Sequence, residues 1–198
     1  MTEESIAAAA DAIRDGDLVV YPTETVYGLG ADALNEAAVE RVFEAKRRSR
    51  DKPISLAVPD ADAALEYVRA TDRERRFMRE FLPGPVTLLC EKRDEVPDVL
   101  TGGRERVGVR IPDHEVALAL LREVTPVTAT SANVSGRESA TRVADLDDEI
   151  RDASAVVLDG GETGGTGSTV VNVETGEIVR EGPNADSVRD WLHTESAE

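Results

Sequence analysis

The densest positive charge in the sequence lies at residues 46–52, KRRSRDK, where five of the seven side chains are lysine or arginine. One interpretation is a solvated helix end, since basic side chains favour helix C-termini. The other is a phosphate site, because guanidinium groups bind phosphate oxygens in pairs and lysine adds a compact charge. The whole chain carries 40 acidic against 23 basic residues. Concentrated positive charge in so acidic a chain favours the phosphate site.

A second candidate for anion binding is the loop at residues 160–169, GGETGGTGST. Its five glycines free backbone N–H groups to face an anion, and Ser168 and Thr169 add hydroxyls. A flexible surface loop would have the same composition. Taken alone, this segment supports the two interpretations equally.

Two further segments carry polar groups at the ends of expected strands. Arg110 follows alternating apolar residues in GVRIPDH, so it is either an edge charge or a group that binds a carboxylate. Residues 130–136, TSANVSG, gather hydroxyls and an amide. Asn133 and Ser135 either form the turn there or contact a nucleotide.

Common nucleotide motifs fit the sequence poorly. Gly28, Gly30 and Ala33 spell G-x-G-x-x-A. A polar loop separates these glycines from the preceding strand, and the next helix signal waits for Asn35, so a dinucleotide fingerprint receives little weight. No glycine-rich run ends in the Gly-Lys-Ser or Gly-Lys-Thr of a Walker A motif.

Hydrolase and metal sites are also disfavoured. Ser131 does not stand in a G-x-S-x-G elbow. Of the two histidines, His193 lies near the end of the chain and His114 stands at an expected helix start, where capping explains it. Cys90 is the only cysteine, so it can form no intramolecular disulfide and no cysteine cluster for zinc.

The elements that must position these groups alternate along the whole chain. Strands and helices mix without a composition break, which favours one α/β domain around a mixed sheet. Ligands tend to bind in the loops that follow the strands of such folds. Residues 22–30 are expected to be one of these loops. The expected strands are 17–21, 53–58, 83–92 after a turn, 106–111, 126–131, 155–158, 168–173 and 177–180, and the expected helices are 5–15, 35–47, 60–69, 71–82, 113–123 and 184–192.

Composition limits the setting in which the protein works. The 198 residues suit one domain. The net charge is −17 and the chain holds only three lysines, a composition that we take to indicate a protein working in concentrated salt. The N-terminus lacks the basic start and apolar stretch of a signal peptide, and no apolar run reaches membrane-spanning length. A cytoplasmic protein without a membrane partner is expected.

Seven segments, in this order, resemble the motifs of the YrdC-type threonylcarbamoyl-AMP synthases. The resemblance covers about residues 5–183, and accidental similarity of seven ordered motifs is very improbable. The segments are PTETVYGLGADA at 22–33, AKRR at 45–48, PGPVTLL at 83–89, VGVRIPDH at 107–114, TSANVSG at 130–136, STVVN at 168–172 and VREG at 179–182.

The resemblance implies a single-domain α/β fold of the YrdC/RibB-like type, a twisted mixed β-sheet with flanking helices around a basic cleft. The synthase domain would span residues 5–183. Residues 184–198 would form a C-terminal helix and a frayed tail, without the additional C-terminal domain of some relatives. The family condenses L-threonine, bicarbonate and ATP, with Mg²⁺, into threonylcarbamoyl-AMP and pyrophosphate. A separate transferase then delivers the threonylcarbamoyl group to adenosine 37 of tRNA, which makes tRNA an indirect partner.

The same resemblance implies roles for individual side chains. Lys46 and Arg48 are the expected catalytic residues, and no protein side chain is assigned to a metal. The expected ATP-binding residues are Lys46, Arg48, Lys52, Ser131, Asn133 and Arg180, and the expected threonine-binding residues are Thr25, Tyr27, Arg110, Thr130 and Ser168.

Two other functions compete with the synthase. One is an RNA-binding protein of the same fold without synthase activity, which the net charge of −17 disfavours because phosphate contacts supply most non-specific affinity. The other is a carbamoyl-transfer module of hydrogenase maturation. Those modules sit in longer chains with zinc-binding cysteines, whereas this sequence has only Cys90.

Overall fold

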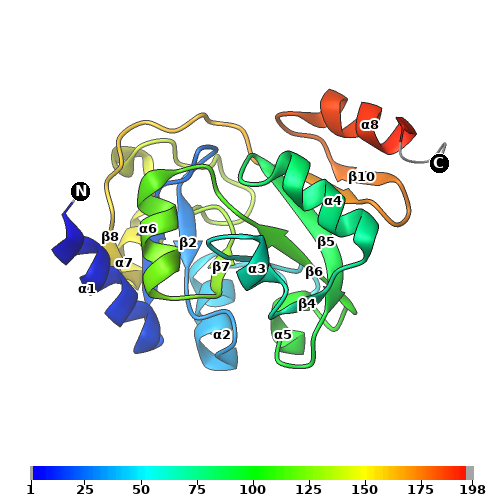
Figure 1. Cartoon of the computed structure of the whole chain (residues 1–198). Helices are drawn as coiled ribbons and strands as arrows, with labels where there is room; N and C mark the ends of the chain where they lie inside the picture. The colour runs from blue at the N-terminus through cyan, green and yellow to red at the C-terminus, as the bar shows by residue number, and fades with distance from the viewer. Residues whose placement is uncertain (1, 195–198) are drawn as a thin grey trace.

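The frame of the computed structural model, which describes residues 2–194, is formed by mixed β-sheets (Figure 1). A three-stranded sheet has the order β2-β1-β8, and a larger sheet has the order β10-β9-β5-β6-β3-β7 with β4 beside β5. The strands are β1 Leu18–Tyr21, β2 Gly28–Gly30, β3 Ser55–Ala57, β4 Val68–Arg69, β5 Val86–Lys92, β6 Arg106–Arg110, β7 Val127–Ala129, β8 Ser154–Val157, β9 Thr169–Asn172 and β10 Glu177–Arg180.

Helices cover these sheets, and α1 and α8 lie at opposite ends of the molecule (Figure 1). The helices are α1 Glu3–Arg14, α2 Glu36–Ala45, α3 Ala61–Ala64, α4 Asp72–Phe81, α5 Asp98–Thr101, α6 Glu115–Glu123, α7 Asp148–Ala153 and α8 Ala185–Thr194, with a 3₁₀ turn η1 at Val143–Asp145. The predicted α/β fold with a mixed sheet and flanking helices is therefore confirmed. Residues 195–198 of the expected tail lie outside the described residues.

The larger sheet is mixed at its centre. β5 is antiparallel to β6 and parallel to β9, while β6 is parallel to β3. Leu88 on β5 and Val109 on β6 are paired and fully buried. Both are aliphatic, in a chain of which only 4% is aromatic. β6 consequently lies inside the sheet, with Arg110 at its end.

Backbone bridges join the two sheets at the segments that carry the ordered motifs. Gly28 pairs with Ser131, and Asp32 pairs with Val127. The amide of Leu29 donates to the carbonyl of Thr130 at 2.8 Å. Residues 22–33 and 126–133 are far apart in the sequence, yet these bonds place them side by side.

The prediction that residues 22–30 form only a loop is wrong, because Gly28–Gly30 form β2 and pair with β1. The reason is the ring of Tyr21, which covers this strand. A Cβ on Gly28 would lie 2.9 Å from Tyr21 Cζ, and one on Gly30 would lie 2.8 Å from a methyl carbon of Val127. The two glycines therefore allow β2 to pack closely against Tyr21 and Val127.

Two expected helix starts are confirmed by their capping bonds. The side chain of Asn35 accepts hydrogen bonds from the amides of Ala37 and Ala38 at the start of α2. His114 Nδ1 accepts from the amide of Val116 at 3.2 Å at the start of α6. Each bond satisfies a backbone donor that the helix itself leaves unpaired. The capping role assigned to His114 thus accounts for its position.

Short elements account for the remaining differences. The expected helix at 60–69 splits into α3 and the strand β4, whose Val68 is fully buried. The helices α5 and α7 were not expected. Each has only one or two turns. Leu100 and Thr101 of α5 are fully buried, as is Ile150 of α7. Such short segments carry too little periodicity to distinguish a helix from a loop.

Candidate active site

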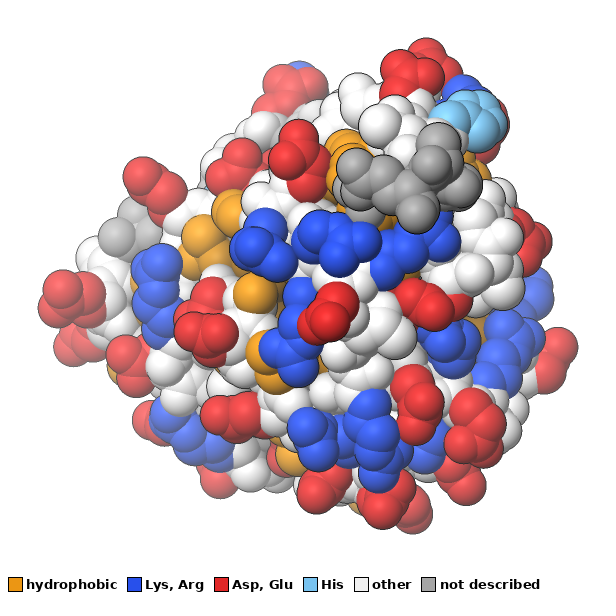
Figure 2. Space-filling model, turned by 45° about the vertical axis from the view of Figure 1, so that its right-hand side comes forward, with side chains coloured by type: hydrophobic (Ala, Val, Ile, Leu, Met, Phe, Trp, Pro, Cys, Tyr) orange, Lys and Arg blue, Asp and Glu red, His pale blue; other side chains and the backbone are white. Residues whose placement is uncertain are grey.

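A cavity of about 1000 Å³ opens along β6, between the loops that follow β1 and β7 and the residues that directly precede β9. Among the described residues, six basic and two acidic side chains line it, in a chain whose net charge is −17. Figure 2 shows one face of the molecule on which Lys and Arg side chains gather across the middle, with Asp and Glu side chains among them and around the margin. The basic lining residues are Arg48, Lys52, Arg104, Arg106, Arg110 and Arg180, and the acidic ones are Asp51 and Glu105.

One corner of the cavity is built around the buried guanidinium of Arg110. Its Nη2 donates to Thr25 Oγ1 at 2.9 Å and lies 2.9 Å from a carboxylate oxygen of Glu24. Apart from this ion pair, the two buried oxygens of Glu24 have no hydrogen-bond partner among the described residues. Thr25 and Arg110 line the cavity. This corner suits a ligand carboxylate, because a planar guanidinium binds two oxygens at once.

A second group closes the wall formed by β5, β9 and β10. Arg180 donates to the carbonyl of Ser168 through Nε at 3.0 Å and Nη2 at 2.8 Å, and to its hydroxyl at 3.0 Å. That hydroxyl lies 2.7 Å from Thr87 Oγ1. Burial, followed by the charges of Arg110 and Arg48, lowers the pKa of Arg180. Arg110 and Arg48 are therefore close enough to Arg180 for their charges to repel it, and an anion bound beside Arg180 would relieve that repulsion.

Arg48 is fixed by the loop that follows it. Its Nε donates to the carbonyl of Lys52 and its Nη2 to the carbonyl of Pro53, each at 3.0 Å. Burial lowers the pKa of Arg48. Lys52, Thr130 and Ser131 also line the cavity. The structure thus brings eight of the eleven predicted site residues to one cavity.

Lys46 lies behind the cavity wall and is almost fully buried. Its ammonium group donates to the main-chain carbonyls of Ser131 and Asn133, the latter at 2.8 Å. Its own carbonyl accepts from the amide of Ser135 at 2.8 Å. Burial, reinforced by the charge of Arg48, lowers the pKa of Lys46 to about 7. In this structure Lys46 fixes the 131–135 segment.

Tyr27 and Asn133 also lie outside the cavity lining and hold the loops that border it. The Tyr27 hydroxyl donates to the carbonyl of Gly161 at 2.7 Å and accepts from the amide of Gly160 at 3.1 Å. Asn133 Nδ2 donates to the carbonyl of Arg137 at 2.9 Å, and its Oδ1 accepts from the Ser131 hydroxyl. Both residues contribute through loop position.

Backbone amides of the glycine-rich loop donate hydrogen bonds to the neighbouring segment at residues 22–25. The amide of Gly164 donates to the carbonyl of Glu24 at 3.3 Å, and that of Gly165 donates to Thr25 at 2.6 Å. The loop is therefore tied to residues 22–25 as well as to Tyr27. Only Gly167 and Ser168 of residues 160–168 line the cavity.

Among the polar residues at this site that the sequence-based prediction missed, four supply pairing partners or positive charge. They are Glu24 and Thr87, which pair with Arg110 and Ser168, and Arg104 and Arg106, which line the cavity. The sequence did carry a signal for Arg106. Residues four apart in a strand lie on the same face, and Arg106 is four residues from Arg110. No comparable signal identified the other three, because their partners are distant in the sequence.

Two absences are relevant to the chemistry. In residues 2–194, no group of three or more His, Cys, Asp or Glu side chains could hold a metal ion. Over the same residues, every helix is too short or too polar to cross a lipid bilayer.

The sequence and the fold of the chain are matched in known proteins. The family model Sua5_yciO_yrdC, described as "Telomere recombination", matches residues 11–182. The chain belongs to the Sua5/YciO/YrdC family. The resemblance noted in the sequence is thereby confirmed over nearly the whole chain.

Members of this family with similar sequences carry the name threonylcarbamoyl-AMP synthase. The protein of that name from Pyrococcus abyssi is 42% identical over 174 residues, covering 86% of this chain and 51% of the relative. The one from Idiomarina loihiensis is 36% identical and covers 88% and 96%. A crystal structure of P. abyssi Sua5 complexed with L-threonine has a TM-score of 0.86 at 40% identity, covering 92% and 55%. The chain thus spans about half the length of the P. abyssi relative.

Proposed function

We propose that this family member is a threonylcarbamoyl-AMP synthase, a nucleotidyltransferase that uses ATP, L-threonine and bicarbonate for tRNA modification. The observation that carries the proposal is the convergence of Arg48, Arg110 and Arg180 on one cavity in a chain of strongly negative net charge. Two of the substrates are anions and L-threonine carries a carboxylate, so the site must supply positive charge and hold the reactants close together in the correct orientation. The product would serve a separate transferase, with tRNA as the eventual acceptor.

L-threonine is assigned to the corner around Arg110. The guanidinium would bind the substrate carboxylate, while Thr25, Thr130 and Ser168 offer hydroxyls. The amine condenses with bicarbonate to a carbamate with loss of water. Tyr27 acts on this corner through the glycine-rich loop, which its hydroxyl holds.

ATP is assigned to the basic side of the cavity next to the 130–136 segment. Arg48 and Lys52 would bind the phosphates, and Arg180 would close the site. Ser131 and Asn133 would contact the nucleotide. Lys46 would hold their main-chain carbonyls, and its protonation would respond to the charge of the phosphates. A carbamate oxygen attacks the α-phosphorus. The bond from that phosphorus to its bridging oxygen breaks, and pyrophosphate leaves with the electron pair.

Mg²⁺ is proposed to enter on the phosphates of ATP. Mg²⁺ commonly keeps several waters and binds through substrate phosphates with few protein carboxylates. No protein ligand is assigned to the ion. When bound, the ion would neutralise phosphate charge.

Replacing Arg48 by alanine should damage ATP use far more than folding. The variant loses a guanidinium that faces the phosphates, and we expect kcat/KM for ATP to fall by roughly a hundredfold. Its own bonds go to two carbonyls, so the free energy of unfolding should fall by only about 1–2 kcal/mol. Steady-state kinetics and chemical denaturation measure the two effects.

The neighbouring Arg47 provides the matched control. Its side chain is exposed and lies 3.3 Å from Glu149, away from the cavity. Arg47→Ala removes the same charge from the same loop and should leave ATP use within about twofold, because an exposed pair contributes little. Equal losses in both variants, or equal losses of activity and stability in Arg48→Ala, would contradict the assignment.

A further inference from the structure

The helix α8 follows the last of the ordered motifs, and no step of the proposed reaction uses it. It lies beside α4 and β10 at one end of the molecule (Figure 1). Only residues 181–184 separate it from Arg180, whose guanidinium closes one wall of the cavity. The position of that guanidinium therefore depends on how α8 and the junction are held.

The strand β10 supports Arg180 only weakly by its own contacts. It lies at the edge of the larger sheet and pairs with β9. Ile178 is its only half-buried residue, and the others are exposed. The register with β9 shifts between Ile178 and Arg180, which places a bulge at Val179, and a bulge turns the side chains next to it. An edge strand with so little buried surface needs support from neighbouring elements.

The junction between β10 and α8 packs directly on residues 167–169, which form part of the same cavity wall. A Cβ on Gly182 would lie 2.3 Å from the carbonyl oxygen of Gly167 and 2.7 Å from the amide nitrogen of Thr169. Thr169 Oγ1 donates to the carbonyl of Pro183 at 2.5 Å. A displacement of α8 would therefore move this wall.

The other end of α8 packs onto α4 through Trp191, the only tryptophan of the chain. The Trp191 ring meets the ring of Phe77 edge-on, with 5.0 Å between centroids, and the ring of Phe81 at 6.4 Å. Val188 of the same helix is fully buried. Edge-to-face aromatic contacts stabilise a packed pair beyond the area that they bury. Trp191 therefore fixes α8 relative to α4.

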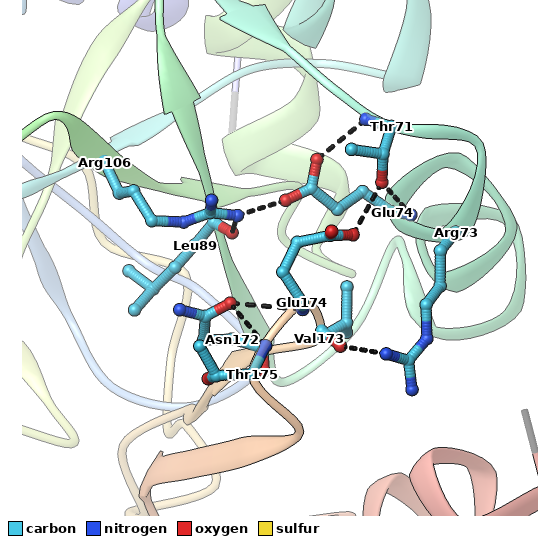
Figure 3. A network of polar contacts seen from close by, with 9 residues as sticks. All are labelled: Thr71, Arg73, Glu74, Leu89, Arg106, Asn172, Val173, Glu174 and Thr175. Carbon is cyan, nitrogen blue, oxygen red and sulfur yellow. Dashed lines mark hydrogen bonds and ion pairs between the residues drawn. The ribbon is translucent and has the colours of Figure 1, made fainter. Parts of the chain in front are cut away.

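α4 and its N-cap also hold the turn at the opposite end of the β9–β10 hairpin (Figure 3). Arg73 donates to the carbonyl of Val173, and the Thr71 hydroxyl donates to Glu174 at 2.8 Å. The guanidinium carbon of Arg73 also lies 5.7 Å from the centre of the Trp191 ring, within the range of a cation–π interaction. The hairpin is thus supported at its turn by α4 and at its open end by α8.

We infer that Trp191 is a positioning residue for Arg180. It holds α8 on α4, and the two helices together hold the β9–β10 hairpin so that Arg180 faces the cavity. Trp191 itself lies outside the cavity lining. An arginine that is already held in place loses less rotamer freedom when it binds an anion. The inference rests on the proposed function in one respect, since that function gives Arg180 its ligand, ATP.

A double-mutant cycle on ATP binding tests whether Trp191 acts through Arg180. Trp191→Ala should weaken ATP binding roughly three- to thirtyfold, measured by calorimetric titration at one fixed salt concentration. Trp191→Phe keeps an aromatic ring against α4 and should recover most of the affinity. In the Arg180→Gln background, Trp191→Ala should have little further effect, because the group that it positions is absent. Equal losses in both backgrounds would overturn the inference. Trp191→Leu replaces Trp191→Ala in the cycle if the alanine variant does not fold.

Ile13→Ala is the matched control for a general loss of stability. Ile13 is fully buried in α1, at the opposite end of the molecule from α8 (Figure 1). Its removal should destabilise the fold to a similar degree as Trp191→Ala. The ATP affinity of the folded Ile13→Ala protein should nevertheless stay within about twofold of the unmodified protein. A loss of affinity as large as that of Trp191→Ala would reduce Trp191 to a general structural role.

Hydrogen exchange of the ligand-free protein separates a failure of this inference from a failure of the proposed function. Trp191→Ala should speed the exchange of the amides of β9 and β10 roughly tenfold and leave those of β1 unchanged. An unselective change, or none, would contradict the positioning role. A selective change in a protein that binds no ATP would support that role and reject the synthase instead.

Discussion

Replacing Arg110 by glutamine should raise the KM for L-threonine by roughly a hundredfold or more, with a smaller effect on the KM for ATP. Removing one partner of a buried, hydrogen-bonded charge pair costs about 2–5 kcal/mol of binding free energy. Arg110 is buried at the cavity wall and oriented by Thr25 and Glu24. Glutamine keeps a hydrogen-bond donor but loses the charge and the paired geometry.

Discrimination between L-threonine and L-threoninol gives the sharper measurement. L-threoninol lacks the carboxylate, so the unmodified protein should bind it far more weakly, and the Arg110 variant should bind both equally. Arg110→Gln also leaves Glu24 buried without its cation. The double variant Glu24→Gln/Arg110→Gln restores charge balance, and it should fold and still fail to discriminate. A folded double variant that keeps the preference for L-threonine would place the substrate carboxylate elsewhere.

Replacing Lys46 by methionine should lower ATP-dependent turnover by roughly a hundredfold and change how stability depends on pH. The carbonyls of Ser131 and Asn133 lose their shared donor. Leaving buried acceptors unpaired costs about 1–3 kcal/mol each. The 131–135 segment, which borders the cavity, would then lose its fixed position.

The pH dependence follows from the lowered pKa of Lys46, about 7 in the folded protein against a usual 10.5. Between these values the unfolded chain binds a proton that the folded protein does not. The free energy of unfolding contributed by Lys46 therefore rises with pH across this window and is constant below it. Between pH 7.5 and 9.5, Lys46 should raise the free energy of unfolding of the unmodified protein by about 2 kcal/mol. The Lys46→Met variant should lack this rise. Denaturation curves at several pH values give the free energy of unfolding of both proteins. The same dependence on pH in the variant and in the unmodified protein would contradict this prediction.

The segments that resemble the synthase motifs predicted residues that the structure brings together at one cavity, while the roles of these residues stay proposals. Hydroxyl-rich and basic stretches followed strand signals, and the chain brings Thr25, Arg48, Arg110 and Ser168 to one cavity. What the sequence could not show is which of them face the ligand. Lys46 carries the charge expected of a phosphate ligand, yet its burial and two carbonyl partners become apparent only once α2 packs behind the 131–135 segment.

Helices and strands were predictable where the sequence has strong periodicity or a capping residue. They were not predictable where tertiary packing determines the local structure. Asn35 and His114 announced helix starts that the structure has. β2 was not predicted, because its glycines are typical of a loop and only the folded structure shows that the ring of Tyr21 covers them. The role of Glu24 was not predicted, because its carboxylate pairs with Arg110, which is 86 residues away in the sequence.

Pyrophosphate release from ATP and Mg²⁺ tests the proposed function most directly. It should be measured at high salt, with and without L-threonine and bicarbonate. The synthase predicts release that requires both, together with a threonylcarbamoyl-AMP adduct in the mass spectrum. Release without threonine would indicate a different acyl acceptor. No release at any salt concentration would contradict the synthase and return attention to RNA binding, which tRNA titration would then measure.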